Sequence, residues 1–239
     1  MFVLYLDAYH LGDPLFLTGL ARDARARFDA GGSGFVIVHG TGEAGERAVE
    51  ALGIEPARES GALVPPTPEA ARAAERAGRD LLRQVVHELS EAGVHAVRVT
   101  GADRGLVRAD GSIGKASWVG DLARQRAVPV VLSLAPEASG EVGSGAPGGA
   151  PDVREVDPAG LSGRLAAAIG AEAVVALGTP LAGDGTLSAE AADGAVPDSD
   201  ALRRIALGGV GVRVARRAAL RAPGVPGREV TSSPDGEPA

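Results

Sequence analysis

The sequence predicts an α/β protein whose mainly parallel sheet is covered by helices on both faces. Short apolar runs alternate with longer segments of helical periodicity, and several of the runs are apolar throughout. Such runs are typical of strands buried on both faces of a parallel sheet, and their alternation with helices is typical of α/β proteins. A chain of 239 residues can bury such a core without disulfides.

In the first half of the chain, predicted strands alternate with predicted helices. The apolar residues of 14–28 recur at mostly helical spacing, and the stripe within 68–92 is the longest helical signal. Gly53 is typical of a residue that ends a helix. The predicted strands are 3–6, 35–38 and 96–100, and the predicted helices are 14–28, 43–52 and 68–92.

The second half contains the same kinds of element, separated by glycine-rich and polar stretches. Residues 139–151 are too poor in apolar side chains to bury a core, and the chain from about Ser232 is expected to be loosely held. A short element is predicted at 106–108. The elements predicted after it are a helix at 118–126, a strand at 128–134, a helix at 158–169, a strand at 173–177 and a helix that runs from before Arg203 to Arg221.

The composition excludes several kinds of protein. The chain has no cysteine, which excludes disulfides and thiolate-ligated metals and fits a reducing cytoplasm. No apolar run approaches the roughly 20 residues of a membrane span, so a soluble protein is expected. A net charge of −7 argues against a nucleic-acid surface. The four histidines have no metal-ligand spacing, so we predict no metal site built by the protein alone.

A glycine turn carries the clearest functional signal. An apolar strand at 35–38 leads into His39, then Gly40-Thr41-Gly42, and then a helix. Glycines let backbone N–H groups approach a ligand closely, and a helix begins with its positive end. The pattern therefore predicts a site for a phosphate or a carboxylate, although a plain tight turn between strand and helix has the same spacing.

The order of several short segments resembles the amino acid kinase family, and within it the acetylglutamate kinases. The likeness extends over about residues 1–217. The segments that carry it are Val-His-Gly-Thr-Gly, Leu-Gly-Ile-Glu-Pro at 52–56, Ser60-Gly61, Val-Thr-Gly-Ala-Asp at 99–103, Val-Pro-Val-Val at 128–131, Ile-Gly-Ala-Glu at 169–172 and Gly208-Gly209.

The resemblance implies a three-layer αβα sandwich with two lobes. Residues 1–135 would form an N-terminal lobe that binds an acylated amino acid, and 152–231 a C-terminal lobe that binds ATP and magnesium. Segments 136–151 and 232–239 are expected to be flexible. The γ-phosphoryl group would pass to the side-chain carboxylate, as in arginine biosynthesis, and a homo-oligomer, at least a dimer, is expected.

The resemblance also implies roles for individual residues. Arg213 is the candidate catalytic cation. The expected phosphate- and substrate-binding residues are Gly40, Thr41, Gly42, Gly61 and Asp157. The expected nucleotide-binding residues are Gly178, Thr179, Gly208 and Gly209.

The sequence departs from the family at the cationic positions. Where the first strand of the family ends in Lys-x-Gly-Gly, this chain has Leu-Tyr-Leu-Asp-Ala at 4–8, and Leu63 stands where an arginine would clamp the substrate. The family's Asn-x-Asn-Ala-Asp becomes Glu-Val-Asp-Pro-Ala at 155–159, which puts negative charge near the substrate. Lys115 is the single lysine, in a segment expected to be a solvated loop.

Three functions stay open from the sequence. The first is an acetylglutamate kinase-like enzyme. The second is a non-catalytic family member that binds a small ligand or acts as a regulatory or structural subunit, and the number of cations favours it, because phosphoryl transfer depends on electrostatic stabilisation. The third is a carboxylate- or phosphate-binding protein without a nucleotide. A face formed by Arg213, Arg216, Arg217 and Arg221 is expected to be solvated or salt-bridged, or else to meet ATP phosphates or another subunit.

Overall fold

A single large sheet runs through the molecule. The computed structural model describes residues 1–137, 153–178, 186–188, 191–192 and 194–231. The eight strands of this sheet lie in the order β10 (Leu187–Ser188), β12 (Arg228–Thr231), β11 (Gly211–Ala215), β9 (Ala173–Leu177), β1 (Phe2–Leu6), β2 (Phe35–His39), β6 (Val128–Leu132) and β5 (Ala96–Thr100). Of the described strand pairs in this sheet, only β11 with β12 is antiparallel.

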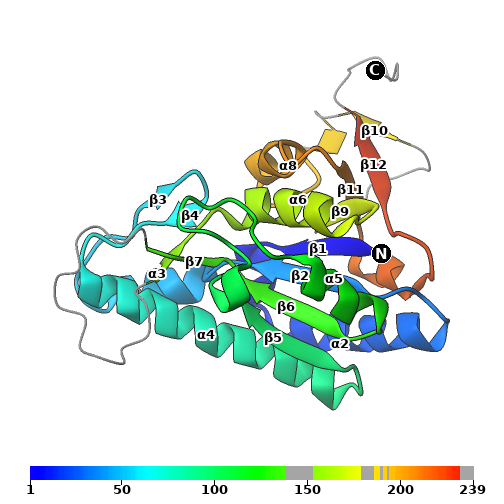
Figure 1. Cartoon of the computed structure of the whole chain (residues 1–239), viewed down its shortest axis with the longest axis horizontal. Coiled ribbons are helices and arrows are strands. Elements are labelled where there is room, and N and C mark those ends of the chain that lie inside the picture. The colour runs from blue at the N-terminus through cyan, green and yellow to red at the C-terminus, as the bar shows by residue number, and fades with distance from the viewer. Residues whose placement is uncertain (138–152, 179–185, 189–190, 193, 232–239) are drawn as a thin grey trace.

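Helices cover both faces of the sheet (Figure 1). One face packs on α5 (Ser117–Arg124), α6 (Pro158–Ile169) and α8 (Ser199–Ala206), and the other on α2 (Pro14–Asp29) and α4 (Pro68–Glu91). The short α1 (Ala8–Leu11) follows β1, and α3 (Gly42–Glu50) follows β2 and packs on α4. The predicted three-layer αβα sandwich is confirmed.

The first strand shows how the sequence builds these layers. Side chains alternate between the two faces of a strand. In β1, Phe2, Leu4 and Leu6 belong to the core on the α2–α4 side, whereas Val3 and Tyr5 belong to the core on the α5–α6 side. All five are buried, so the strand is apolar throughout, as a central parallel strand must be.

Two small hairpins lie outside the large sheet. One pairs β3 (Arg58–Glu59) with β4 (Ala62–Leu63), and the other pairs β7 (Leu134–Pro136) with β8 (Val153–Glu155). The predicted strand 128–134 is thus two strands, and Pro136 belongs to the second of them. The predicted flexible segments 136–151 and 232–239 otherwise lie outside the described residues, except Glu137. The division into two lobes stays a prediction.

The predicted helix from Arg203 to Arg221 is wrong. The helix α8 ends at Ala206, the strand β11 follows the glycine pair, and a short 3-10 helix, η2 (Arg217–Arg221), comes after it. The backbone of β11 pairs with β9 and β12, and Val212 and Val214 are buried in the core on the α5–α6 side of the sheet. A helix at this position could not pair with both strands. Residues 106–108 form no regular element, although Val107 bridges to Ile113, and η1 (Asp103–Gly105) precedes them.

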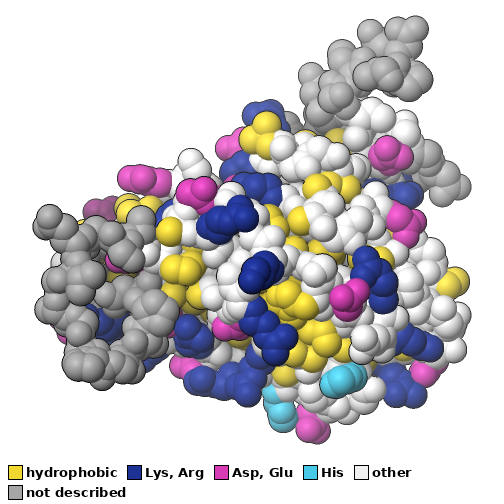
Figure 2. Space-filling view, viewed as in Figure 1, with side chains coloured by type: hydrophobic (Ala, Val, Ile, Leu, Met, Phe, Trp, Pro, Cys, Tyr) yellow, Lys and Arg dark blue, Asp and Glu magenta, His cyan; other side chains and the backbone are white. Residues whose placement is uncertain are grey.

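The surface carries both signs of charge. On the face shown in Figure 2, Lys and Arg side chains lie among Asp and Glu side chains, with hydrophobic side chains between them. Lys115 is exposed in the loop before α5, in agreement with its predicted place. Among the helices that the structure describes, none is long and apolar enough to cross a membrane.

Candidate functional site

The glycine turn lies at the carboxyl end of a central strand. The strand β2 runs between β1 and β6, and its continuation through Gly40, Thr41 and Gly42 leads into α3. Gly42 adopts a φ of +59°, which favours glycine. In open parallel sheets, ligands bind outside the carboxyl ends of the strands. The turn thus occupies the position expected of a binding site.

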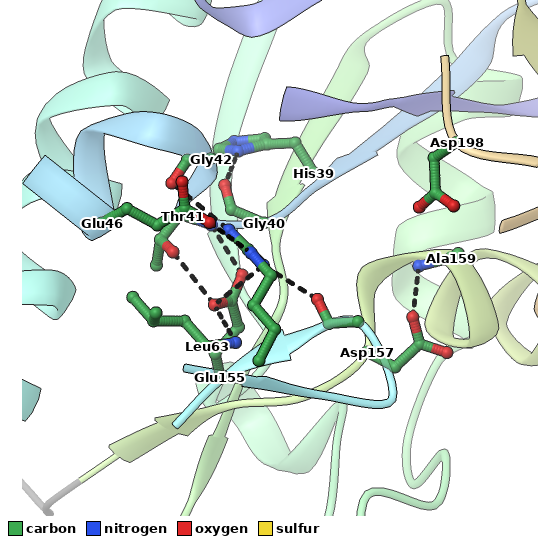
Figure 3. A network of polar contacts seen from close by, with 12 residues as sticks. His39, Gly40, Thr41, Gly42, Glu46, Leu63, Glu155, Asp157, Ala159 and Asp198 are labelled. Atoms are coloured by element: carbon green, nitrogen blue, oxygen red, sulfur yellow. Dashed lines mark hydrogen bonds and ion pairs between the residues drawn. The ribbon is translucent and has the colours of Figure 1, made fainter. Parts of the chain in front are cut away.

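The turn is occupied by a carboxylate of the chain itself (Figure 3). The Oε1 atom of Glu155 accepts a hydrogen bond of 2.7 Å from the Thr41 N–H. Its Oε2 atom accepts bonds of 3.0 Å from the Thr41 hydroxyl and 2.9 Å from the Leu63 N–H. Glu155 ends β8, so three segments that are distant in sequence meet at one carboxylate.

The charge of Glu155 is held almost entirely by neutral donors. Its side chain is 3% exposed, and Arg58 is the cation that approaches it, with Nη1 4.0 Å from Oε2. Burial raises the pKa of Glu155 above its ordinary value, although the bonds from Thr41 and Leu63 and the charge of Arg58 oppose that rise. Such an environment resembles that of a bound anion rather than that of a salt bridge.

Two cavities adjoin the residues around this carboxylate. We call the first the hairpin cavity; it has a volume of about 370 Å³ and is lined by Thr41, Glu59, Ser60, Ala62, Leu63, Val64, Pro65, Ala71, Ala74, Glu75, Leu134, Glu137, Val153, Arg154 and Glu155. The second, the strand-end cleft, has about 330 Å³ and is lined by Tyr5, Leu6, Asp7, Ala8, Tyr9, Leu11, Gly40, Gly42, Glu43, Glu46, Arg58, Gly61, Pro158, Pro197 and Asp198.

The strand-end cleft is acidic. Its described lining includes four carboxylates, those of Asp7, Glu43, Glu46 and Asp198, and one guanidinium, that of Arg58. Burial raises the pKa of the Tyr5 hydroxyl, and the negative charges of Asp198 and Asp7 raise it further. The cleft therefore has a negative potential at the end of β1.

Arg58 in this cleft and Arg204 near it are both engaged by carboxylates. Arg58 Nε lies 2.6 Å from Glu46 Oε1, and its Nη1 donates to the Gly61 carbonyl at 2.9 Å. Arg204, on α8, donates to Asp157 at 3.2 Å and to Asp198 at 2.8 Å. Burial alone would lower the pKa of Arg204, but these two carboxylates outweigh burial and raise it.

Asp7 directly follows the first strand, in the stretch that has neither the lysine nor the glycines of the family motif. Its carboxylate caps α1 by accepting from the His10 N–H at 2.9 Å, and His10 Nδ1 lies 2.9 Å from both carboxylate oxygens. The side chain is thus used to begin a helix, and it brings a negative charge to the cleft.

Five predicted residues come together at the site. Gly40, Thr41 and Gly42 form the turn, Gly61 lies in the β3–β4 hairpin, and Asp157 caps α6 by accepting from the Gly160 N–H at 2.9 Å. Their role in binding a substrate or a phosphate stays a prediction. Figure 3 shows Asp157 and Asp198 beside the turn, on the side of α6.

The predicted nucleotide residues that the structure describes lie elsewhere. The Gly178 N–H donates to the Ala215 carbonyl at 3.0 Å, and Gly208 packs on α6 at Gly163. Gly209 follows in the turn before β11, and Thr179 lies outside the described residues. Their role in nucleotide binding stays a prediction.

Arg213 was expected on a basic helical face, but the structure does not place it there. It is in β11, and its Nε and Nη2 donate to the Gly227 carbonyl at 3.0 and 2.7 Å. It is absent from the described linings of both the hairpin cavity and the strand-end cleft. The structure thus shows a bond to the backbone for this guanidinium, and its catalytic role remains a prediction.

Sequence reasoning did not predict which groups Glu155 and Arg204 contact. The segment 155–159 does show that negative charge replaces amides, but nothing in it indicates that the carboxylate reaches Thr41. Arg204 has no distinguishing signal in the linear sequence. Within the described part of the chain, no group of three or more His, Asp or Glu side chains could hold a metal ion.

Comparisons with known proteins agree with the fold. No family model matches the chain. An acetylglutamate kinase from Synechococcus sp. (strain RCC307) is 32% identical over 159 residues, which cover 59% of this chain and 48% of that protein. The chain thus spans about half the length of this curated relative.

Solved structures are similar over nearly the whole chain. An isopentenyl phosphate kinase has a TM-score of 0.60 at 18% identity, covering 97% of this chain and 100% of that one. The N-acetylglutamate synthase of Neisseria gonorrhoeae in complex with coenzyme A and L-arginine has 0.61 at 17%, covering 96% and 60%. The aspartate kinase of Synechocystis has 0.62 at 14%, covering 100% and 40%. The chain has the amino acid kinase fold and is similar in sequence to an acetylglutamate kinase.

Proposed function

We propose that this chain is a small-ligand-binding or regulatory member of the amino acid kinase family that transfers phosphoryl groups at no more than a trace rate. One observation carries the proposal: the strand-end cleft is lined by four carboxylates and one guanidinium among its described residues. A transferring phosphoryl group needs the opposite distribution of charge, because cations stabilise its transition state.

The two arginines described at and near the cleft are not free for this task. Arg58 and Arg204 are bonded to Glu46, Asp157 and Asp198. The single lysine is exposed in the loop before α5. The described residues of the cleft therefore do not fit the phosphates of ATP, and we derive no transfer step. Losing one stabilising donor costs about 3 kcal/mol, or roughly a hundredfold in rate, so two or three losses suppress turnover severely.

The second candidate is an active kinase of the acetylglutamate type. It is favoured by the 32% identity to an acetylglutamate kinase. It would use ATP and magnesium to phosphorylate the carboxylate of an N-acylated amino acid.

Two measurements on the purified chain distinguish these candidates. Calorimetric titration with magnesium–ATP and, separately, with N-acetylglutamate measures binding, and release of ADP measures transfer. We expect ADP release to stay near the background, whether or not either compound binds. Turnover of about 1 per second or faster, as in ordinary enzymes, would contradict the proposal. An active acetylglutamate kinase serves as the positive control.

We also propose a homo-oligomer, at least a dimer, in a reducing cytoplasm. The absence of cysteine from the sequence supports the location. Light scattering on the eluting protein measures the assembly, and a molar mass of 23.9 kDa would show a monomer.

A further inference from the structure

We propose that Glu155 is a built-in occupant of the anion site at the glycine turn. In the native chain, its carboxylate excludes an external anion from the Thr41 and Leu63 N–H groups. Removal of the carboxylate opens that site to a small carboxylate or to inorganic phosphate. This inference deepens the proposed function and rests on it. A family member that does not transfer phosphoryl groups can keep the anion site at the turn closed.

The donors around Glu155 are those of an anion-binding site. Two backbone N–H groups and one hydroxyl converge on the two oxygens at 2.7 to 3.0 Å. One N–H belongs to Thr41, at the start of α3, where the helix has its positive end. The two N–H groups are fixed by the backbone, so they stay in place whichever anion they hold.

Gly40 lies in close contact with the same carboxylate. A Cβ atom at Gly40 would overlap Glu155 Oε1, and it would also lie 3.2 Å from Pro158 Cγ. The glycine that predicts close approach of a ligand is thus in close approach to Glu155. This observation is independent of the hydrogen bonds, and it shows that the turn accommodates an anion at van der Waals distance.

Glu155 also lines the hairpin cavity. Thr41, Leu63 and Glu155 line this cavity, whereas Gly40, Gly42 and Arg58 line the strand-end cleft. Arg58 reaches from Glu46 in the cleft to within 4.0 Å of Glu155. The carboxylate therefore lies where an external anion in the hairpin cavity would otherwise meet the donors of Thr41 and Leu63.

A purely structural role makes a different prediction. If Glu155 only satisfies buried N–H groups, its removal lowers stability, and no added anion restores stability specifically. If it occupies an anion site, a free carboxylate can take its place. The change Glu155→Ala removes a fragment the size of acetate, so acetate is the matched probe, and inorganic phosphate is the second probe.

The experiment measures the midpoint of thermal unfolding of the full chain at pH 7. Glu155→Ala is titrated with acetate and with phosphate, against chloride at equal ionic strength. The control is Leu89→Ala, which removes a buried apolar side chain remote from the turn in sequence and leaves no anion site. We expect a saturable rise of about 3–6 °C for Glu155→Ala at ten times the dissociation constant, and only the general salt effect for Leu89→Ala and the native chain.

A response of Glu155→Ala equal to that of Leu89→Ala would overturn the proposal. A rise with acetate alone would show a carboxylate site, and a rise with phosphate as well a general anion site; both support the proposal. The amide NMR signals of Thr41 and Leu63 in the native chain give a second test of exclusion, which does not require the variant to fold. We expect neither to shift on addition of phosphate or acetate, and a saturable shift of both would overturn the proposal.

This test is separate from the test of the proposed function. It measures binding at the turn without ATP, whereas the other test measures ADP release. If phosphate binds the native turn while ADP release stays at background, the inference fails and the proposed function stands. If ADP is released at an ordinary rate while the turn stays closed to anions, the proposed function fails and the occupancy of the turn by Glu155 stands.

Discussion

Asp23 and Glu155 are two buried carboxylates that the molecule stabilises in different ways. Asp23, on α2, is 1% exposed and accepts bonds from Arg217 Nε at 2.9 Å and Arg221 Nε at 2.6 Å. The Glu155 side chain is 3% exposed and is bonded to backbone N–H groups and a hydroxyl. One carboxylate is neutralised by side-chain cations, and the other by the polarity of the backbone.

The difference distinguishes a carboxylate that holds two segments together from a carboxylate that occupies an anion site. The Asp23 pairs fasten η2 to α2, and the buried Arg27 adds bonds to the carbonyls of Ala222, Pro223 and Gly224. The four arginines were expected to be solvated or salt-bridged, or else to meet ATP phosphates or another subunit. Two of them, Arg217 and Arg221, are salt-bridged to Asp23. Glu155 is approached by Arg58 at 4.0 Å, and the hydrogen-bond donors described around it are neutral groups that would suit any anion of similar size.

Leaving Asp23 without both arginines is expected to have the largest effect. Arg217→Ala with Arg221→Ala leaves a buried negative charge unpaired, which costs about 3–5 kcal/mol of unfolding free energy. Urea unfolding measures this loss. Adding Asp23→Asn to the double variant should recover part of it, because the charge is removed. A loss below about 1 kcal/mol would show that the two carboxylates do not differ in their need for cations.

Crowding Glu155 from the side of the turn is expected to have an intermediate effect. Gly40→Ala places a Cβ atom against Oε1, and overpacking of this kind costs about 1–3 kcal/mol. The control Gly211→Ala meets its nearest atom, the Glu172 carbonyl oxygen, at 3.7 Å and should change stability by less than about 0.5 kcal/mol.

A double-mutant cycle sharpens this prediction. In the Glu155→Ala background, Gly40→Ala should be less destabilising, because the carboxylate it displaces is gone. Equal losses in both backgrounds would mean that Gly40 is required for another reason, such as its contact with Pro158.

The smallest effect is expected in how the stability of the chain changes with pH as Glu155 titrates. Burial raises its pKa in the folded state above the ordinary 4.5, so the folded chain binds more protons than the unfolded chain as pH rises from that value. Stability from this group is therefore present below pH 4.5 and is lost as pH rises through the folded pKa. The native chain should lose stability relative to Glu155→Gln over this range.

The comparison with Glu155→Gln is needed because His39 acts in the opposite direction. Burial lowers the pKa of His39 to about 4 from 6.5, so its contribution to stability increases as pH rises between these values. His39 is present in both proteins, so the difference between their urea midpoints at each pH removes its contribution. A difference that grows in favour of the native chain as pH rises would contradict the prediction.

Local signals explain the elements that the sequence predicted well. The helix α6 was predicted with the same bounds as observed, because Asp157 caps it, Pro158 suits its first turn and Gly170 ends it in the left-handed region. Strand β2, the glycine turn and the start of α3 were also predicted, with α3 ending two residues early, at Glu50.

The region after Gly209 shows where local reasoning failed. Four arginines at helical spacing suggested a helix, but Val212 and Val214 alternate with Arg213 as in a strand. Pairing with β9 and β12 decides between these patterns, because it buries the valines and satisfies the backbone. Neither partner strand is near enough in sequence to be seen in a short window.

The sequence by itself determined the alternation of strands and helices, the position of the glycine turn and the presence of a single lysine. Hydrophobic periodicity, capping residues and residue identity are all local properties. Only the tertiary structure decided what occupies the turn, because Glu155 lies 114 residues from Thr41 and reaches it through β8. Whether a carboxylate meets cations or backbone N–H groups depends on which segments the fold brings together.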